Sequence, residues 1–534
     1  MRITAVVSAL FGLAASAIPA ASQTSPTAVP ASIQSVFDKP LYEGATWGLR
    51  VLDGDKVVID QNSQRQLYIG SVRKVFSVGQ LLNAVGPDHT YDTPVYRTGP
   101  VDANGVLHGN LIVVASGDLT MGGRKNPDGT IAVSDWDHNE ADSLGNAILT
   151  KPNPLAGYDQ LARAVRAAGI ERVTGNVVID DRLFKPYFFR GQFNIRPIFV
   201  NDDVVDVSMG PGGAPGSLKG ISVRPMSAAL RVTNRLRVGA PGSTNTFKLA
   251  PSEPQCIGKP GCTATVSGSL PSNFTPPLTG TPTYVQTVRI VQPSNYARSV
   301  FIERLRAAGI TITAPTVAQN PVALLPAAGS YAQRNRVAVL TGMRYAQDAK
   351  FILKISYNIG ADTSLILLGT KYGANSMPAA LAYARKDLAT RWGIADNLYH
   401  FIDGSGYADT TATNGAVTQM LSELAKSPAS KAFMDALPIL GVDGSLGFVK
   451  DFEKDPTLAG AAGNVRAKTG TYVEPAGDAM DLKGQAYGGY VTTKSGHHLT
   501  FVLTVNGVKV KDVVSITNVF QDEGTIAAIL WRDY

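Results

Sequence analysis

Strand patterns occur at both ends of the chain, and a strongly helical region lies between them from about residue 337 to 437. Near the start, alternating apolar residues around Asp53-Gly54 predict a β-hairpin over residues 46–59. Residues 464–506 again show strand patterns, and apolar residues at helical spacing follow from 516 to 534. The order is typical of one α/β domain to which both ends of the chain contribute.

A large block separates the first helix of this domain from its helical middle. At 534 residues the chain is too long for a single hydrophobic core. We expect residues 33–96 and 336–534 to form the α/β domain, and residues 97–335 to be inserted into it, most simply as two further domains. Residues 205–285 alternate short apolar runs with Pro, Gly, Ser and Thr, so this part of the insertion is expected to be rich in strands.

Residues 1–22 have the pattern of a secretory signal peptide. Arg2 supplies the positive start, and an apolar run and small residues follow it. An uncleaved membrane anchor is the alternative, but the run is short and rich in Ala and Ser. We therefore expect export to the periplasm or extracytoplasmic cell envelope, with at most peripheral membrane association.

The net charge is +7, but Lys and Arg form no dense block. Such a balance gives a mild attraction to an anionic cell envelope. The sequence shows no nucleic-acid-binding motif, and export also argues against such a partner, so none is expected.

The two cysteines, Cys256 and Cys262, enclose a short loop that contains Gly and Pro. An exported protein meets an oxidising environment, where such a pair most simply forms a local disulfide. A metal site would need more ligands, and no histidine lies nearby. We predict a structural disulfide and expect neither metal nor cofactor.

A hydroxyl and an amine lie three residues apart in Gly70-Ser71-Val72-Arg73-Lys74, at the expected start of the first helix. Residues at this spacing share a helix face, so Ser71 and Lys74 should lie side by side. Lys74 could take the serine proton, and a free N–H of the first turn could hold the negative oxygen formed by attack on a carbonyl. On its own the pair is weak, because two exposed residues on a surface helix would look the same.

Two further motifs lie in the last third of the chain. Ser356-Tyr357-Asn358 falls between two helical runs, and Lys468-Thr469-Gly470-Thr471 starts the strand region. Each is common in turns and strand ends. Together, in the order Ser-x-x-Lys, Ser-x-Asn and Lys-Thr-Gly, the three motifs are the signature of penicillin-binding proteins and serine β-lactamases.

The chain further resembles the low-molecular-mass class C penicillin-binding proteins, which are D-alanyl-D-alanine carboxypeptidases and endopeptidases. Residues 401–407 and 437–446 are similar to two segments of that family, Asp-Gly-Ser-Gly and Leu-Pro-x-x-Gly-x-Asp-Gly-Thr-Leu. The family also places extra domains in the long gap between the first two motifs. The resemblance covers most of residues 40–510. It implies a penicillin-binding, serine β-lactamase-like transpeptidase domain, an antiparallel sheet with helices, that carries a large and mostly β insertion.

The resemblance implies a serine enzyme that acts on peptidoglycan stem peptides ending in D-Ala-D-Ala, with β-lactams as covalent inhibitors. Ser71 would form the acyl-enzyme, and Lys74, made neutral by partial burial and by the nearby charge of Lys468, would be its base. The implied catalytic residues are Ser71, Lys74, Ser356, Asn358 and Lys468, and the implied substrate-binding residues are Thr469, Gly470 and Thr471.

The chain departs from the family in places. Tyr357 stands where the family commonly has Asp, and residues 472–485 are expected to be an insertion before the next strand. Residues 135–140 are polar and could suggest a metal site, but adjacent ligands rarely converge, so we expect a surface loop. Two other functions stay open: a β-lactamase-like serine hydrolase or esterase of the same fold, and a non-catalytic envelope-binding protein.

Overall fold

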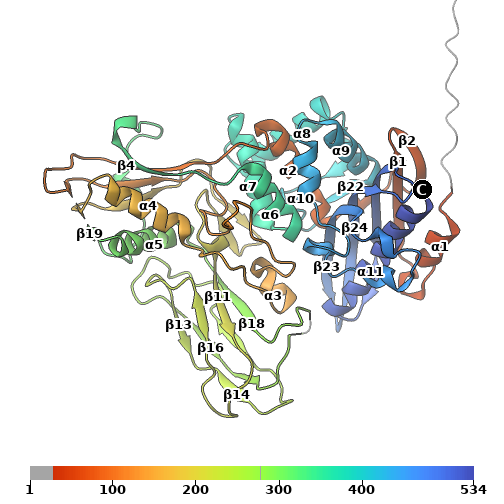
Figure 1. The fold of residues 1–534 in the computed structure, drawn as a ribbon, viewed down its shortest axis with the longest axis horizontal. Coiled ribbons are helices and arrows are strands. Elements are labelled where there is room, and N and C mark those ends of the chain that lie inside the picture. The colour runs from red at the N-terminus through yellow and green to blue at the C-terminus, as the bar shows by residue number, and fades with distance from the viewer. Residues whose placement is uncertain (1–27, 277) are drawn as a thin grey trace, which may run out of the picture.

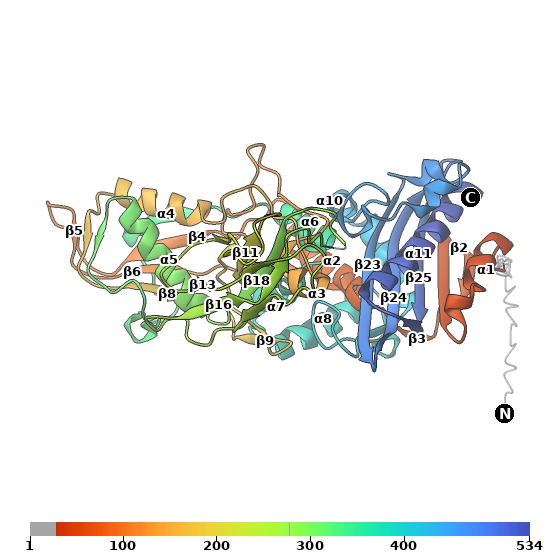
Figure 2. The ribbon, with the colours of Figure 1, turned by 90° about the horizontal axis from the view of Figure 1, so that it is seen from below.

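The computed structural model describes residues 28–276 and 278–534. The expected signal peptide lies outside these ranges. Figures 1 and 2 show an elongated molecule with a sheet covered by helices at one end and residues of the expected insertion at the other. Within the described ranges, the helices are all too short or too polar to cross a membrane.

Strands from the start and the end of the chain form one antiparallel sheet. β1 (Thr46–Asp53) pairs with β2 (Lys56–Gln61) on one side and with β25 (His498–Asn506) on the other. β24 (Ala479–Thr492) and then β23 (Val465–Ala476) extend the sheet beyond β25. β23 therefore lies at an edge, and the expected hairpin over 46–59 is present.

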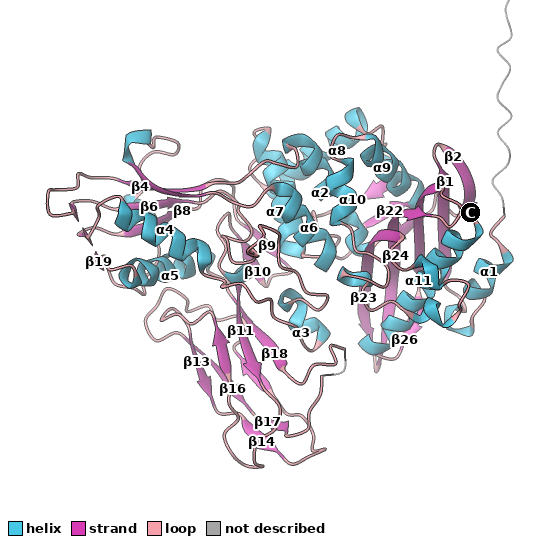
Figure 3. Ribbon diagram, in the orientation of Figure 1, coloured by secondary structure: helices cyan, strands magenta, loops and turns pink. Residues whose placement is uncertain are grey.

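Helices pack on both faces of this sheet. α11 (Val513–Asp533) contributes apolar side chains to a core shared with β1, β24 and β25, and α1 (Ala31–Phe37) packs against α11. α9 (Asn414–Lys426) packs against β1, β24 and β25. A group of helices continues from there, next to the sheet in Figure 3. These helices are α2 (Lys74–Val85), α6 (Tyr345–Ile355), α7 (Asn358–Lys371), α8 (Met377–Arg391) and α10 (Ser430–Ala436).

α7 is buried along most of its length, which makes it the central helix of this group. The helical region begins at Tyr345 and not near residue 337, because residues 336–340 form a strand, β20 (Arg336–Leu340). That short apolar run has the length of a strand, and it pairs with a strand far away in the sequence, which periodicity alone does not show.

A second sheet lies at the other end of the molecule, with strand order β20-β4-β6-β8. Its remaining strands are β4 (Thr93–Arg97), β6 (Leu111–Val114) and β8 (Val177–Asp180). Two helices, α4 (Ala156–Ala167) and α5 (Pro293–Ala307), share its apolar core. Because β4 and β20 are neighbours, the chain enters and leaves this region side by side. That arrangement supports an insertion near 97–335, whose borders stay a prediction.

The described residues between 204 and 290 contain many short strands, as expected, and Figure 1 shows this region projecting as a separate lobe. They are β11 (Val204–Met209), β12 (Ser222–Arg224), β13 (Arg231–Asn234), β14 (Arg237–Gly239), β15 (Lys248–Ala250), β16 (Thr263–Ser267), β17 (Ser269–Pro271) and β18 (Tyr284–Arg289). The smaller elements elsewhere are β3 (Gln66–Tyr68), β5 (Val106–Leu107), α3 (Ala141–Leu144), β7 (Arg172–Val173), β9 (Tyr187–Phe189), β10 (Phe193–Ile195), β19 (Thr311–Ile312), β21 (Tyr399–His400), β22 (Thr411–Thr413) and β26 (Val508–Val510).

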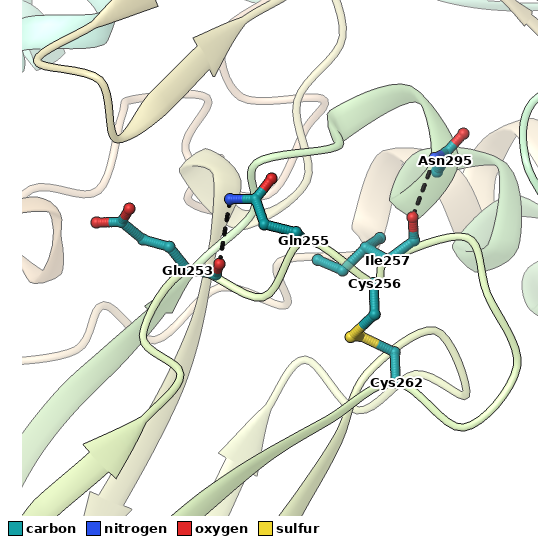
Figure 4. The surroundings of a disulfide bond; sticks show 6 residues. All are labelled: Glu253, Gln255, Cys256, Ile257, Cys262 and Asn295. Atoms are coloured by element: carbon teal, nitrogen blue, oxygen red, sulfur yellow. Dashed lines mark hydrogen bonds between the residues drawn. A yellow bond between two sulfur atoms is a disulfide. The ribbon is translucent and has the colours of Figure 1, made fainter.

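Cys256 and Cys262 form a disulfide, with their Cα atoms 5.3 Å apart. Asn295 of α5 donates a hydrogen bond to the carbonyl of Ile257 inside the closed loop, at 3.0 Å (Figure 4). The disulfide loop thus joins the strand-rich lobe to the helix that covers the second sheet.

The expectation that residues 472–485 precede the next strand is wrong, because they already belong to β23, β24 and the turn between them. Tyr472 pairs with Gly484, and the two strands continue to a turn at Gly477-Asp478. β26 pairs with the far part of β24 and extends the ladder there. The extra residues therefore lengthen a β-hairpin beside the motif Lys468-Thr469-Gly470 and do not form a loop.

Candidate active site

Ser71 and Lys74 lie side by side, as their spacing predicts. Gly70–Arg73 forms a 3-10 turn, η2, and α2 begins directly after it at Lys74. The Lys74 Nζ atom is 2.7 Å from Ser71 Oγ. Ser71 is partly accessible whereas Lys74 is fully buried, so the hydroxyl can meet a substrate while the amine is shielded from water.

Lys74 has two further polar neighbours. Its Nζ atom lies 2.6 Å from Asn358 Oδ1 and 2.8 Å from the carbonyl oxygen of Ser405. Burial lowers the pKa of Lys74 to about 7, although the carboxylates of Asp362 and Asp403 oppose this. The charge of Lys468, which was expected to lower this pKa, is not among its causes; besides burial, the nearby charge of Arg190 lowers it. Half of the lysine is neutral near pH 7, as a general base requires.

The second motif lies at a break between two helices. Ser356 ends α6 in a left-handed conformation with φ 64°, which non-glycine residues seldom adopt, and Asn358 begins α7. Tyr357, the departure from the family pattern, points into the core and packs on Phe351 with ring centres 4.7 Å apart. The motif thus presents its serine and its asparagine to the site and buries its middle residue.

The third motif lies on the edge strand β23. Lys468 Nζ is 3.0 Å from Ser356 Oγ and 2.7 Å from the carbonyl oxygen of Thr469. Burial and the nearby charge of Lys74 hold the pKa of Lys468 well below its usual value. Thr469 Oγ1 is 2.7 Å from Ser445 Oγ, so residues 437–446, noted above for their resemblance, also reach this strand.

Glycines allow the edge of β23 to approach η2. A Cβ atom on Gly470 would lie 2.0 Å from the carbonyl oxygen of Ile69. Gly70 has φ +47°, and a Cβ there would lie 2.7 Å from the backbone nitrogen of Thr471. These close contacts bring the first and third motifs together, and the bonds of Lys74 to Asn358 and of Lys468 to Ser356 add the second.

A loop from residues 403–406 closes the site from another side. The carboxylate of Asp403 accepts hydrogen bonds from the backbone of Ser405 at 3.0 Å and of Gly406 at 2.8 Å. Asp362 of α7 accepts one from the backbone of Gly404 at 2.8 Å. These bonds fix the Ser405 carbonyl that meets Lys74. The sequence singled out this segment by resemblance alone and gave its residues no role.

The expectation of a polar surface loop at residues 135–140 is wrong, because Asp137 and His138 are both buried. The Arg124 guanidinium bonds to Asp137 at 2.7 and 2.8 Å and to Asp202 at 2.7 Å. Burial disfavours a charged His138, but the carboxylates of Asp206 and Asp202 raise its pKa to about 10. The partners come from distant parts of the chain, so the local sequence gives no sign of them.

The side chains of Asp137, His138 and Asp202 are close enough together to suggest a metal site. Arg124 contacts all three, with its Nη2 2.9 Å from His138 Nε2. Arg124 and the protonated His138 already supply two positive charges beside these carboxylates, and a protonated imidazole cannot bind a metal. The donor set therefore fits an ionic cluster better than a metal centre.

Glu140 follows this cluster and reaches the active site. Its Oε1 accepts a hydrogen bond of 2.6 Å from Asn358 Nδ2. Arg190, at the turn between β9 and β10, places Nη1 3.9 Å from Glu140 and its guanidinium 5.0 Å from the ring centre of Tyr407. Sequence reasoning noted Glu140 only within the polar segment 135–140, to which it gave no role at the active site, and it did not single out Arg190.

Comparison with known proteins places this geometry in a family. Residues 29–521 match the model of the D-Ala-D-Ala carboxypeptidase 3 (S13) family. A D-alanyl-D-alanine carboxypeptidase from Actinomadura sp. (strain R39) is 24% identical over 92% of this chain and 84% of its own. D-alanyl-D-alanine carboxypeptidase DacB from Haemophilus influenzae is 23% identical over 92% and 91%. The crystal structure of penicillin binding protein 4 (dacB) from Haemophilus influenzae covers 94% of this chain and 99% of that one, with TM-score 0.66 and 19% identity.

Proposed function

Because the chain belongs to the D-Ala-D-Ala carboxypeptidase 3 (S13) family, we propose that it is a serine peptidase that cleaves the D-Ala-D-Ala bond of peptidoglycan stem peptides. One observation carries the proposal: Ser71 Oγ lies 2.7 Å from Lys74, a buried amine with a pKa of about 7. Such an amine can be neutral, and so can take the serine proton, at the pH where the enzyme would work.

The hydrogen-bond partners of Lys74 fix the direction of its lone pair. A neutral amine has two N–H donors and one lone pair, whereas Asn358 Oδ1 and the Ser405 carbonyl can only accept. These two oxygens therefore take both N–H groups. The lone pair is left for the third neighbour, the Ser71 hydroxyl, which donates its proton to it during attack.

In the proposed reaction, Ser71 Oγ bonds to the carbonyl carbon of the penultimate D-alanine while its proton passes to Lys74. The backbone N–H groups of Ser71 and Thr471 would bind the resulting oxyanion, where one lost donor typically costs about 2.7–4 kcal/mol. The C–N bond then breaks, and the leaving amine receives this proton from Lys74, relayed through Ser356, so that Lys74 is neutral again. Water attacks the ester carbonyl while Lys74 takes its proton, and that proton passes to Ser71 Oγ as the ester bond breaks and the acid is released.

Lys468, Thr469 and Thr471 would bind the terminal carboxylate of the substrate, with Gly470 allowing the close approach of the strand. The Lys468 amine already lies 3.0 Å from Ser356. An arriving carboxylate would favour its charged form and so would offset the burial that lowers its pKa. Substrate binding and the charge of Lys468 are thus coupled.

β-Lactams would acylate the same serine, since their amide resembles the scissile bond. The structure of the Haemophilus influenzae penicillin binding protein 4 in complex with a β-lactam supports this choice of inhibitor. We further propose that the protein is exported to the cell envelope, on the strength of the signal-like residues 1–22 and the disulfide.

The test is release of D-alanine from a synthetic peptide ending in D-Ala-D-Ala, followed by chromatography with the wild type and Ser71→Ala. We expect release by the wild type and none by the variant. Benzylpenicillin hydrolysed faster than the peptide is cleaved would favour the β-lactamase-like hydrolase. Failure of the wild type to release D-alanine or form a penicillin adduct would favour the non-catalytic alternative.

A further inference from the structure

The orientation of the Asn358 side chain decides whether Lys74 can act as a base. An asparagine amide has an acceptor oxygen and a donor NH2 group of nearly the same shape, and a half-turn exchanges them. With the oxygen toward Lys74, as observed, the amide takes a lysine N–H. With the NH2 group there, it would donate to the lysine lone pair and compete with the Ser71 proton.

We propose that Glu140 is a positioning residue that locks Asn358 in the active orientation. This inference rests on the proposed roles of Ser71 and Lys74. The Glu140 carboxylate can only accept, and it lies 2.6 Å from Asn358 Nδ2, on the side of the amide away from the lysine. The half-turn would place two acceptors together at Glu140, so the carboxylate excludes the inactive orientation.

Glu140 is itself held in place from two directions. It ends a short 3-10 turn, His138–Glu140, whose first residue and preceding Asp137 belong to the buried cluster around Arg124. On the outer side, Arg190 lies 3.9 Å from its carboxylate. The buried cluster thus anchors the backbone next to Glu140, and the arginine adds a weaker attraction from the rim of the site.

With this role for Glu140, the insertion contributes a side chain that supports catalysis. Glu140 and Arg190 both lie within residues 97–335, whereas Ser71, Lys74 and Asn358 lie outside them. Removal of the Glu140 carboxylate would leave the catalytic side chains in place but would let Asn358 occupy both orientations. The expected defect is a slower acylation step in a protein that stays folded.

The test is the acylation rate constant with a fluorescent penicillin at pH 9, in a double-mutant cycle of Glu140→Gln and Asn358→Asp. Glutamine can present either end of its amide, so Glu140→Gln no longer excludes the inactive orientation, and acylation should slow by at least about twofold, the factor for two equally populated orientations. Asn358→Asp should be slower still, because two carboxylates then face each other.

The double variant should be at least about threefold faster than Asn358→Asp alone. The glutamine introduced at position 140 can donate to the carboxylate introduced at position 358. Both oxygens of that carboxylate accept, so it has no inactive orientation. The matched control is Glu171→Gln, which removes another glutamate of the insertion that pairs with an arginine, Arg166, at 2.8 Å. It should acylate at the wild-type rate.

Two outcomes overturn the inference: a wild-type rate for Glu140→Gln, or a double variant no faster than Asn358→Asp. A merely structural role for Glu140 would give no such rescue. Acylation that persists in Ser71→Ala would instead overturn the proposed function, so the two failures are distinguishable.

Discussion

At the scale of single residues, the site depends on how completely Lys74 is removed from water. Its side chain is fully buried, and burial is the largest cause of a pKa of about 7. The neighbours then direct its lone pair at Ser71. Only a buried lysine has its pKa lowered in this way. On an exposed helix, which the Ser-x-x-Lys motif alone would also allow, Lys74 would stay charged.

This pKa predicts the pH dependence of acylation. Below pH 7 Lys74 is mostly charged and cannot take the Ser71 proton, whereas above pH 7 it is mostly neutral. The acylation rate constant should therefore rise with pH and reach half its plateau near pH 7. Stopped-flow measurement with a fluorescent penicillin from pH 5 to 9 checks this. A flat profile, or a midpoint above about pH 9, would contradict a buried neutral lysine.

The motif residues could be found from the sequence because each motif pairs fixed residue types at short spacing. The roles of Glu140 and Arg190 could not be found in this way, because only the fold brings Glu140 to Asn358 and Arg190 to Glu140. Asp137 and His138 were misjudged for the same reason, since their burial depends on residues far away in the sequence, such as Asp202. Local polarity does not distinguish a solvated loop from a buried ionic cluster.

At the scale of elements, the active site forms where the edge strand β23 meets η2. Both sides of this contact use glycine, Gly70 and Gly470, because a side chain would not fit between the two backbones. The distance between Ser71 and the Lys468 strand is therefore set by backbone contact, not by the choice of catalytic side chains.

Gly470→Ala tests this contact. The added Cβ would lie 2.0 Å from the carbonyl oxygen of Ile69, so β23 must shift away from η2. A shift of about 1 Å at a reacting group can lower a rate on the order of 100-fold, and we expect a loss of this size in acylation. The control is Gly210→Ala, where the new Cβ meets nothing within 4 Å. A wild-type rate for Gly470→Ala would show that the contact is not needed.

Periodicity and turn residues are local signals. They were sufficient to predict the hairpin over 46–59, the break at residue 356 and the final helix. They did not predict the strand β20 or the long β23–β24 hairpin. β20 pairs with β4, which lies far away in the sequence, and the outer part of β24 pairs with β26 as well as with β23; no local pattern identifies these partners. Strand patterns in the insertion were recognised, but their sheet order follows only from the structure.

At the scale of the whole molecule, residues from the insertion reach the catalytic helices through the buried ionic cluster. The Arg124 guanidinium lies 4.2 Å from the ring centre of Phe351 on α6 and also binds Asp137 and Asp202. This contact joins the insertion to the helices next to Ser356 and Asn358. The same cluster also holds the backbone beside Glu140.

Arg124→Met should therefore destabilise the protein strongly. It would leave the carboxylates of Asp137 and Asp202 buried without the arginine that pairs with both, and removing one partner of a buried ion pair typically costs about 3–5 kcal/mol. Urea unfolding followed by circular dichroism measures the loss. The matched control is Arg166→Met, an exposed ion pair whose removal should cost less than about 1 kcal/mol. If both variants lost the same free energy of unfolding, the buried cluster would not stabilise the protein more than an exposed ion pair does.

The disulfide should act locally. Replacing Cys256 and Cys262 with serine opens a short loop of the strand-rich lobe, for which loop entropy predicts a loss of about 2 kcal/mol. Hydrogen exchange should rise around residues 256–262, while acylation of Ser71 stays at the wild-type rate. A large fall in acylation would show instead that this lobe controls the active site.

The central claim is that Ser71 is the nucleophile, and peptide mapping of the benzylpenicillin adduct tests it most directly. The wild type should gain the mass of one penicillin, located by tandem mass spectrometry on Ser71, and Ser71→Ala should gain none. An adduct on another residue, or one that persists in Ser71→Ala, would contradict the account.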